Sequence, residues 1–333
     1  MFSSHAGFRY RTLAAMRSCQ QGTPMNYRGR FAPSPTGDLH FGSLVTATAS
    51  YLDARANNGQ WLLRIEDVDK TRTVPGAADQ ILHTLEAFGF AWDGPVWMQS
   101  QRDAAYLAAL EQLAARGLLY PCQCSRSQIA AAAVHSLTDG SLLYPGTCRP
   151  VKGSMHVLTE FAPSAAWRLR VDDQRVICFD DLLQGTFCEQ LGLEVGDFVL
   201  RRADGLFAYQ LAVVVDDAEQ GVNAVVRGAD LLGSTARQMY LQQCLGYPQP
   251  VYAHLPLATD AYGKKWSKKR LAPALQPAEA GLLLWHALRF LGQPVPDELA
   301  GAAPGELWNW ALQHWALAQV PHCITLRTPA ALI

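Results

Sequence analysis

Two short runs of the chain contain residues that could hold and activate a nucleotide. The first, RFAPSPTGDLHFGS, extends from Arg30 to Ser43 and reads as a strand that leaves through a proline-restricted turn into a helix. Its His40 and Gly42 would then lie where a helix N-terminus can bind phosphate. The second run, YGKKWSKKR, covers residues 262–270 and is dense in lysine.

These residue types suit the activation of a carboxylate by ATP. In that reaction the carboxylate attacks the α-phosphate and pyrophosphate leaves, so the site needs donors that strengthen as charge grows on the phosphates. His40 and Lys268 meet that need, with Lys265 a weaker second lysine, and Gly42 lets adenine approach the backbone closely. A capped helix start and a solvated basic turn would explain either run alone. The prediction therefore depends on the two runs occurring together.

A third run, RIEDVDKTR over residues 64–72, supplies acids at the end of a second predicted strand. Glu66, Asp67 and Asp69 lie there, where a carboxylate could hold an α-amino group. An exposed turn of acids and bases would explain the same letters. The run thus becomes a binding hypothesis only beside the nucleotide motifs.

Three of the eight cysteines form a cluster with the spacing of a metal site. Cys122 and Cys124 lie in PCQC, and Cys148 ends YPGTC. Three thiolates need a fourth ligand to complete a tetrahedral zinc site. The candidates for that place are Tyr144, His135 and His156. Three buried structural cysteines are the alternative, and the scatter of the other cysteines favours a reducing compartment, the cytoplasm, over a disulfide framework.

The composition is that of an ordinary globular protein. With 333 residues, 49% of them hydrophobic and 17% charged, the chain can bury a core of two or three packed units. The formal net charge of −1 excludes a strongly basic surface, so any RNA contact must be local. No apolar stretch approaches the roughly 20 residues of a membrane helix, and no membrane partner is expected.

Strands and helices alternate along the first third of the chain. A helix is predicted over residues 39–59, ending at Gly59, then a strand over 60–67, and further helices over 75–90, with Pro75 in the first turn, and over 103–116. This order predicts an α/β fold with a doubly wound parallel sheet and ligands at the carboxyl ends of its strands.

The later part of the chain divides into further regions. Short strands, turns and the cysteine cluster after Tyr120 predict an insertion, after which the nucleotide fold resumes with a helix that Gly246 closes. Helices are expected near residues 282–291 and 307–318. Residues 1–24 contain three arginines and no acid, which is compatible with a transit peptide, but a disordered tail or over-extended start is the simpler interpretation. The predicted regions are 1–24, 25–119 (first catalytic half), 120–197 (zinc and acceptor-binding insertion), 198–250 (second catalytic half) and 251–333 (lysine loop and helical stem-contact region).

The two nucleotide runs resemble the HIGH and KMSKS motifs of class I aminoacyl-tRNA synthetases. RFAPSPTG and RIEDVDKTR, with AYQLAVVVDD and VVRGAD further on, resemble the glutamyl branch of that class, so the resemblance covers residues 30–270. It implies a Rossmann-type catalytic domain that uses ATP with Mg²⁺ and L-glutamate. The implied catalytic residues are His40 and Lys268, and the implied ATP contacts are His40, Gly42, Ser43, Lys265 and Lys268. The implied glutamate pocket comprises Arg30, Phe31, Ala32, Pro33, Ser34, Glu66, Tyr209 and Arg227.

Arginine suits this pocket because its planar guanidinium binds a carboxylate bidentately, which the amide of glutamine would not match. Arg227 therefore favours glutamate over glutamine. Tyr209, taken alone, reads as an ordinary core aromatic. The chain departs from the usual motifs at Trp266, where Met or Leu is common, and at Val68, where Thr is common, but neither change removes an assigned chemical group.

The resemblance also bears on zinc and on the acceptor. Truncated paralogues of the glutamyl branch use a tyrosine four residues before the last cysteine as the fourth ligand, which matches Tyr144 and implies one structural zinc ion. Only 64 residues (333 − 269) follow Lys269, too few for a large anticodon-binding region. The implied acceptor is the queuosine base in the anticodon loop of tRNA(Asp). A truncated glutamyl-tRNA synthetase that charges a tRNA 3′ end and a noncatalytic RNA-binding paralogue are the alternatives.

Overall fold

The computed structural model describes residues 26–133, 135–137, 140–151, 161, 164–260 and 273–328. The predicted tail over residues 1–24 and the lysine run with Lys265 and Lys268 lie outside these ranges. Among the described residues, no helix is both long and apolar enough to cross a membrane.

The amino-terminal part forms a parallel sheet with helices in its connections, as predicted. Its elements are β1 (Arg28–Phe31), α1 (Phe41–Ala56), β2 (Gln60–Ile65), α2 (Ala77–Ala87) and β3 (Trp97–Met98). The strands pair in the order β1-β2-β3, with Arg30 opposite Leu62. Helix α2 begins later than predicted, because Gly76 has a φ of 77° at the N-cap and so Pro75 lies outside the helix.

A second sheet contains the elements that bring the distant site residues back to β1. They are β6 (Val176–Asp181), β7 (Gly185–Gln190), α6 (Tyr209–Glu219), β9 (Ala224–Gly228), α7 (Thr235–Leu245) and β10 (Val251–Leu255). The strand order is β7-β6-β10-β9, and β9, β10 and β6 are parallel. Asn223 donates its backbone N–H to the carbonyl of Arg28, which holds β9 beside β1. Gly246 ends α7 with a φ of 72°, as predicted.

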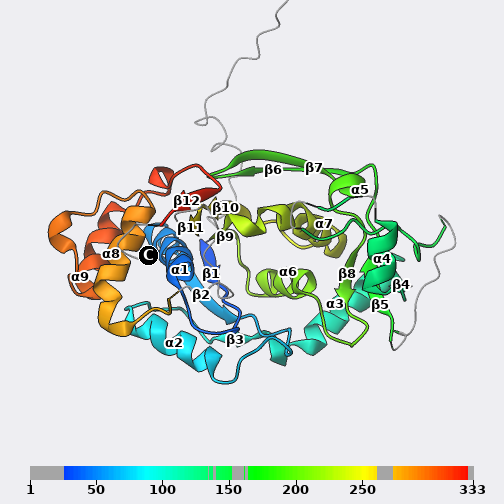
Figure 1. Ribbon diagram of the computed structural model, residues 1–333, viewed down its shortest axis with the longest axis horizontal. Helices are drawn as coiled ribbons and strands as arrows, with labels where there is room; N and C mark the ends of the chain where they lie inside the picture. The colour runs from blue at the N-terminus through cyan, green and yellow to red at the C-terminus, as the bar shows by residue number, and fades with distance from the viewer. Residues whose placement is uncertain are drawn as a thin grey trace, which may run out of the picture.

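A smaller antiparallel sheet forms the part that contains the cysteine cluster. Its elements are α3 (Asp103–Ala115), β4 (Leu119–Cys122), α4 (Arg126–Ala132), β5 (Ala166–Leu169), α5 (Leu191–Glu194) and β8 (Phe198–Arg201). The strand order is β4-β5-β8. Figure 1 shows this sheet at the end of the molecule opposite α8 and α9.

One cysteine pair departs from the expectation of reduced thiols. Cys178 and Cys188 form a disulfide between β6 and β7. The two residues are opposite each other in the antiparallel register, which brings their side chains together on the exposed face of the hairpin. Cysteine spacing alone did not predict this, because the pairing depends on the register of a hairpin that the sequence pattern did not define.

The carboxyl-terminal part packs on the first helix. Its elements are β11 (Leu257–Thr259), α8 (Ala280–Phe290), α9 (Pro304–His314) and β12 (Thr325–Arg327), and short 3₁₀ turns cover Gln99–Gln101, Ala229–Ser234, Pro277–Glu279, Asp297–Leu299 and Leu317–Gln319. Phe290 meets Phe41 of α1 edge to face at 5.7 Å, and Trp308 of α9 lies 5.0 Å from the Tyr51 ring. The helices α8 and α9 therefore share a core with α1 (Figure 1).

Candidate active site and metal centre

A cavity of about 550 Å³ lies at the carboxyl ends of the parallel strands, where the predicted fold expects a ligand. Segments far apart in the sequence meet there: the end of β1, the first turn of α1, the end of β2, the start of α6 and the end of β9. The predicted residues that line it are Arg30, Phe31, Ala32, Pro33, Ser34, His40, Gly42, Ser43, Glu66, Tyr209 and Arg227. Lys265 and Lys268 lie outside the described residues.

The first turn of α1 presents a histidine and backbone amides to this cavity. His40 is the N-cap, and its Nδ1 accepts a hydrogen bond from the N–H of Ser43 at 3.4 Å. With Nδ1 as the acceptor, the neutral ring carries its proton on Nε2, which is then a donor. A Cβ at position 42 would lie 3.1 Å from Cε1 of His40. Glycine thus leaves room for the imidazole, because a larger residue would press on the ring, a reason the sequence analysis had not considered.

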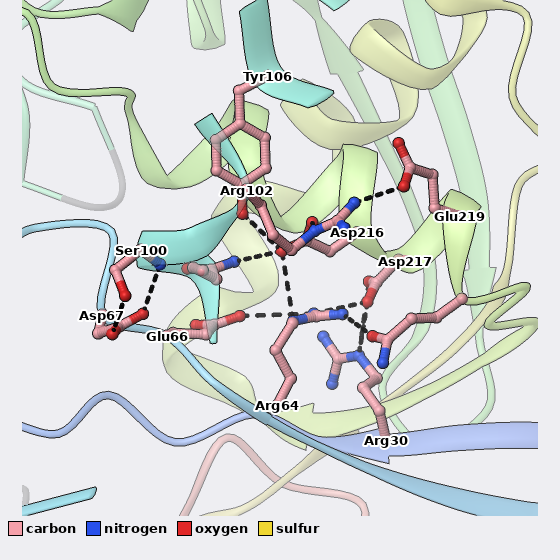
Figure 2. Close-up of polar contacts among 12 residues, drawn as sticks. Arg30, Arg64, Glu66, Asp67, Ser100, Arg102, Tyr106, Asp216, Asp217 and Glu219 are labelled. Carbon is pink, nitrogen blue, oxygen red and sulfur yellow. Dashed lines mark hydrogen bonds and ion pairs between the residues drawn. The ribbon is translucent and has the colours of Figure 1, made fainter. Parts of the chain in front are cut away.

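The amino-acid side of the cavity is built on a buried ionic network (Figure 2). Arg64 is fully buried and donates to Asp217 at 2.7 Å and to Gln220 at 2.6 Å. Arg30 donates through Nε to the same Asp217 carboxylate at 3.2 Å. Since this contact uses only Nε, and the described residues show no hydrogen bond from its terminal nitrogens, Arg30 presents a planar pair of donors at the cavity wall.

Asp216 and Asp217 were not predicted as site residues. Both are buried in α6, where Asp216 accepts from Arg102 at 2.6 Å and from the Tyr106 hydroxyl at 2.8 Å. A possible signal was present in AYQLAVVVDD, because two adjacent acids at the end of an apolar helix need cationic partners if they are buried. The sequence did not say which arginines those partners would be.

Glu66 carries a strongly perturbed carboxyl group. Its side chain is 7% exposed, and burial raises its pKa to about 7, with Arg64 and Arg30 opposing the rise and Asp217 adding to it. Within the described part of the chain its Oε1 makes no hydrogen bond, and the nearest cation is Arg64 at 3.5 Å. A buried acceptor of this kind at the cavity wall suits a cationic ligand group.

Arg227 is more fully engaged than the sequence analysis assumed. Its Nε donates to His254 at 3.0 Å, and its terminal nitrogens donate to Gln238 at 2.7 Å, to Thr235 at 3.0 Å and to the carbonyl of Leu231 at 3.3 Å. Four of its five N–H groups therefore bond to the protein. The bidentate geometry that the sequence analysis assigned to Arg227 is met better by Arg30, while Arg227 supplies charge and one remaining donor.

Tyr209 lies at the first position of α6, on the wall of the cavity. Burial raises the pKa of the Tyr209 hydroxyl to about 12, and the nearby Glu66 carboxylate adds to the rise. The phenol is therefore protonated at neutral pH and can donate a hydrogen bond. The tyrosine is a wall residue as well as a partner of the neighbouring hydrophobic core.

The cysteine cluster has the geometry of a single metal site. The sulfur atoms of Cys122, Cys124 and Cys148 lie within 4.8 Å of one another. The Tyr144 hydroxyl lies 3.4 Å from the Cys122 sulfur and 3.7 Å from the Cys124 sulfur. Such spacing is close to that of ligands around tetrahedral zinc, whose bonds to sulfur are about 2.3 Å. Of the other candidates, His135 lies against the carbonyl of Leu193 at 2.9 Å, and His156 is outside the described residues.

The surroundings of the cluster favour a thiolate. Burial raises the pKa of Cys122, but hydrogen bonds with Tyr144 and Arg168 outweigh it and lower the pKa to about 7. The Arg168 guanidinium also lies 3.8 Å from the centre of the Tyr144 ring. This cation would compensate the negative charge of three thiolates around a divalent ion.

Comparisons with known proteins agree with this arrangement. The family model described as tRNA synthetases class I (E and Q), catalytic domain, matches residues 26–280. A protein of Dechloromonas aromatica (strain RCB) named Glutamyl-Q tRNA(Asp) synthetase is 59% identical over 304 residues, which cover 91% of this chain and 99% of that relative. A protein of the same name from Neisseria meningitidis serogroup C (strain FAM18) is 56% identical over 300 residues, which cover 90% and 99%.

A solved structure resembles this chain over most of its length. It is the crystal structure of a glutamate tRNA ligase from Elizabethkingia meningosepticum in complex with its amino acid. The TM-score is 0.75 at 26% sequence identity, and the match covers 92% of this chain and 68% of that one. The likeness to a ligase of this kind therefore extends well beyond the short sequence motifs.

Proposed function

The chain belongs to the class I tRNA synthetases of the E and Q group, a family of ligases, and from this we propose that it activates L-glutamate with ATP and transfers it to queuosine in tRNA(Asp). The observation that carries the proposal is the single cavity that joins the two halves of the chemistry. One wall holds the helix N-terminus with His40, and another holds Arg30 and Glu66. A nucleotide phosphate and an amino acid would meet between them.

In the proposed activation step the glutamate carboxylate attacks the α-phosphate of ATP, and pyrophosphate leaves. The α1 N-terminus and the Nε2–H of His40 stabilise the charge that grows on the phosphates. The Glu66 carboxylate holds the α-ammonium group of the substrate, and Arg30 holds a substrate carboxylate with its two terminal nitrogens. Lys268 acts on the transition state from the lysine run, with Lys265 as its neighbour, and Mg²⁺ enters bound to ATP.

Zinc has a structural role in this proposal. One ion would be held by Cys122, Cys124, Tyr144 and Cys148. It would cross-link β4 to the turns that follow this strand. The Cys122 thiolate suits a cation, and the nearby Arg168 would compensate the negative charge of the three thiolates. The small sheet around the ion would contact the RNA.

The acceptor is proposed from relatives whose printed name specifies tRNA(Asp) and which match over nearly their whole length. The cyclopentenediol of queuosine offers hydroxyl groups much like those of a terminal ribose. The same active site could therefore esterify either one without further catalytic residues. Transfer to a tRNA 3′ end is accordingly the second candidate function, favoured by the likeness to a glutamate tRNA ligase.

Two assays test the proposal in sequence. Glutamate-dependent exchange of pyrophosphate into ATP is expected without tRNA and should be much weaker with glutamine; the absence of exchange would favour a noncatalytic RNA-binding protein. Labelled glutamate should then enter tRNA(Asp) that contains queuosine, and nuclease mapping should locate it on the anticodon-loop base. Equal incorporation into tRNA(Asp) lacking queuosine would refute the base as acceptor.

Lys268→Ala should lower kcat far more than it raises the KM for glutamate, because the lysine is assigned to the transition state.

A further inference from the structure

Arg227 is hydrogen-bonded to a buried histidine, which is itself paired with a buried carboxylate. The proposed chemistry uses neither group. His254 is directly opposite Arg227 in the parallel pair β9 and β10, so the two side chains leave the sheet on the same face. Asp181 comes from β6, on the other side of β10. The side chains of His254 and Asp181 are fully buried, and Arg227 is 3% exposed.

Hydrogen bonding determines which nitrogen of His254 carries the proton. Oδ1 of Asp181 accepts the backbone N–H groups of Leu183, Gln184 and His254 at 3.0, 3.0 and 3.1 Å. Oδ2 of Asp181 lies 2.6 Å from Nδ1 of His254. A carboxylate can only accept, so Nδ1 carries the hydrogen and Nε2 keeps a lone pair. That lone pair accepts the Nε–H of Arg227 at 3.0 Å.

The electrostatic surroundings keep this ring neutral. Burial lowers the pKa of His254, and the Arg227 cation lowers it further, against the opposing effect of Asp181. A second proton would have to lie on Nε2, directly facing the Arg227 guanidinium. The neutral tautomer with hydrogen on Nδ1 is thus the form that the geometry requires.

We propose that Asp181 and His254 are positioning residues that orient the Arg227 guanidinium, on the wall of the cavity, toward the substrate glutamate, an inference that rests on the glutamate activation proposed above. Asp181 selects the tautomer, His254 holds Nε of Arg227, and Gln238 and Thr235 hold the other end of the guanidinium. One N–H group is left for the substrate. Its direction is therefore set by a strand, β6, that contributes no residue to the cavity wall.

A matched pair of substitutions separates the two ends of His254. In His254→Gln the amide oxygen can replace Nε2 as the acceptor for Arg227, whereas in His254→Asn the amide can replace only Nδ1. The KM for glutamate in pyrophosphate exchange should rise about tenfold or more in His254→Asn, the loss of a hydrogen bond to a charged group, and by less than about threefold in His254→Gln. The KM for ATP should be unchanged in both.

Asp181→Asn tests the tautomer itself. Three backbone N–H groups require the amide oxygen at the Oδ1 position, so the amide nitrogen must face Nδ1 of His254. The ring proton should then move to Nε2 and oppose the Arg227 N–H. The KM for glutamate should rise at least about tenfold, while kcat at saturating glutamate changes little.

Nitrogen-15 NMR of the imidazoles gives a readout that does not depend on activity. The His254 signals, assigned by their absence from the His254→Gln protein, should show a neutral ring protonated on Nδ1 in the wild type and on Nε2 in Asp181→Asn. A wild-type ring protonated on Nε2, or on both nitrogens at pH 7.5, would overturn the proposal even if a variant failed to fold. So would equal KM values for the Gln and Asn variants. Failure of the proposed function would look different: the wild type would show no glutamate-dependent exchange at all.

Discussion

Asp217 is the residue whose removal should most clearly reveal how the amino-acid pocket is held together. Its carboxylate, 8% exposed, accepts from Arg64, which is completely buried, and from Arg30, whose side chain is 5% exposed. In Asp217→Asn both cations stay in place and lose a shared counter-charge. The variant should therefore be less stable, and Arg30 should be less well oriented for glutamate.

The expected loss of stability can be worked from these contacts. Removal of one partner of a buried ion pair costs about 3–5 kcal/mol, and the asparagine carbonyl that still accepts one hydrogen bond restores about 1 kcal/mol. We therefore expect a loss of about 3 kcal/mol. For a chain of 333 residues the unfolding entropy is about 0.7 kcal/mol/K, so the Tm should fall by about 4 °C.

Glu219→Gln is the matched control for this change. It is the same acid-to-amide replacement on the same helix, but Glu219 is 44% exposed and its partner is Arg102. Such a pair contributes at most about 1 kcal/mol, so the Tm should fall by no more than about 1.5 °C. Differential scanning calorimetry measures both shifts, and exchange kinetics should show a higher KM for glutamate only in Asp217→Asn.

Equal Tm shifts in the two variants would refute the reasoning, because the difference between them depends wholly on burial. A large shift in Asp217→Asn with an unchanged KM for glutamate would leave the network as a stabilising element. It would then have no part in orienting Arg30.

Four further predictions concern three parts of the site. Because the raised pKa of Glu66, about 7, leaves the carboxyl protonated in acid, the KM for glutamate should fall as pH rises from 6 to 8, and this dependence should vanish in Glu66→Gln. The same raised pKa means that the Glu66 carboxylate destabilises the fold increasingly as pH rises from its ordinary pKa to about 7. The free energy of unfolding of Glu66→Gln, relative to wild type, should therefore increase over that range. A difference that stays constant with pH would contradict this prediction. Cys124→Ser should lose the zinc ion that elemental analysis is expected to find in the wild type at one per chain; wild-type protein without zinc, purified without chelator, would end the metal assignment. Gly42→Ala should lower kcat for exchange by displacing the His40 ring, from which the new Cβ would be only 3.1 Å away, and full activity would show that the ring position is unimportant.

Local signals in the sequence were sufficient for most elements and for the residue types at the site. Helix α1 follows from its apolar spacing, although it ends at Ala56 with Asn57 as its C-cap and not at the predicted Gly59, and the end of α7 follows from Gly246. The cysteine cluster was also readable, since two of its members are neighbours in the chain and the third follows a tight turn. The domain boundaries remain a prediction.

The tertiary structure decided how those residue types are used. Arg30 and Arg227 are the same residue type at two strand ends, yet one presents its terminal nitrogens to the cavity and the other bonds through four N–H groups to the protein. Their partners Asp217 and His254 are far along the sequence from at least one of the groups they bind. No local sequence pattern therefore connects these partners. Local patterns indicated charged residues at the strand ends, but they did not show which of these charges are buried. Only the packing of β1, β9, β10 and α6 decided which opposite charges meet, because burial without a partner costs more than any local preference can offset.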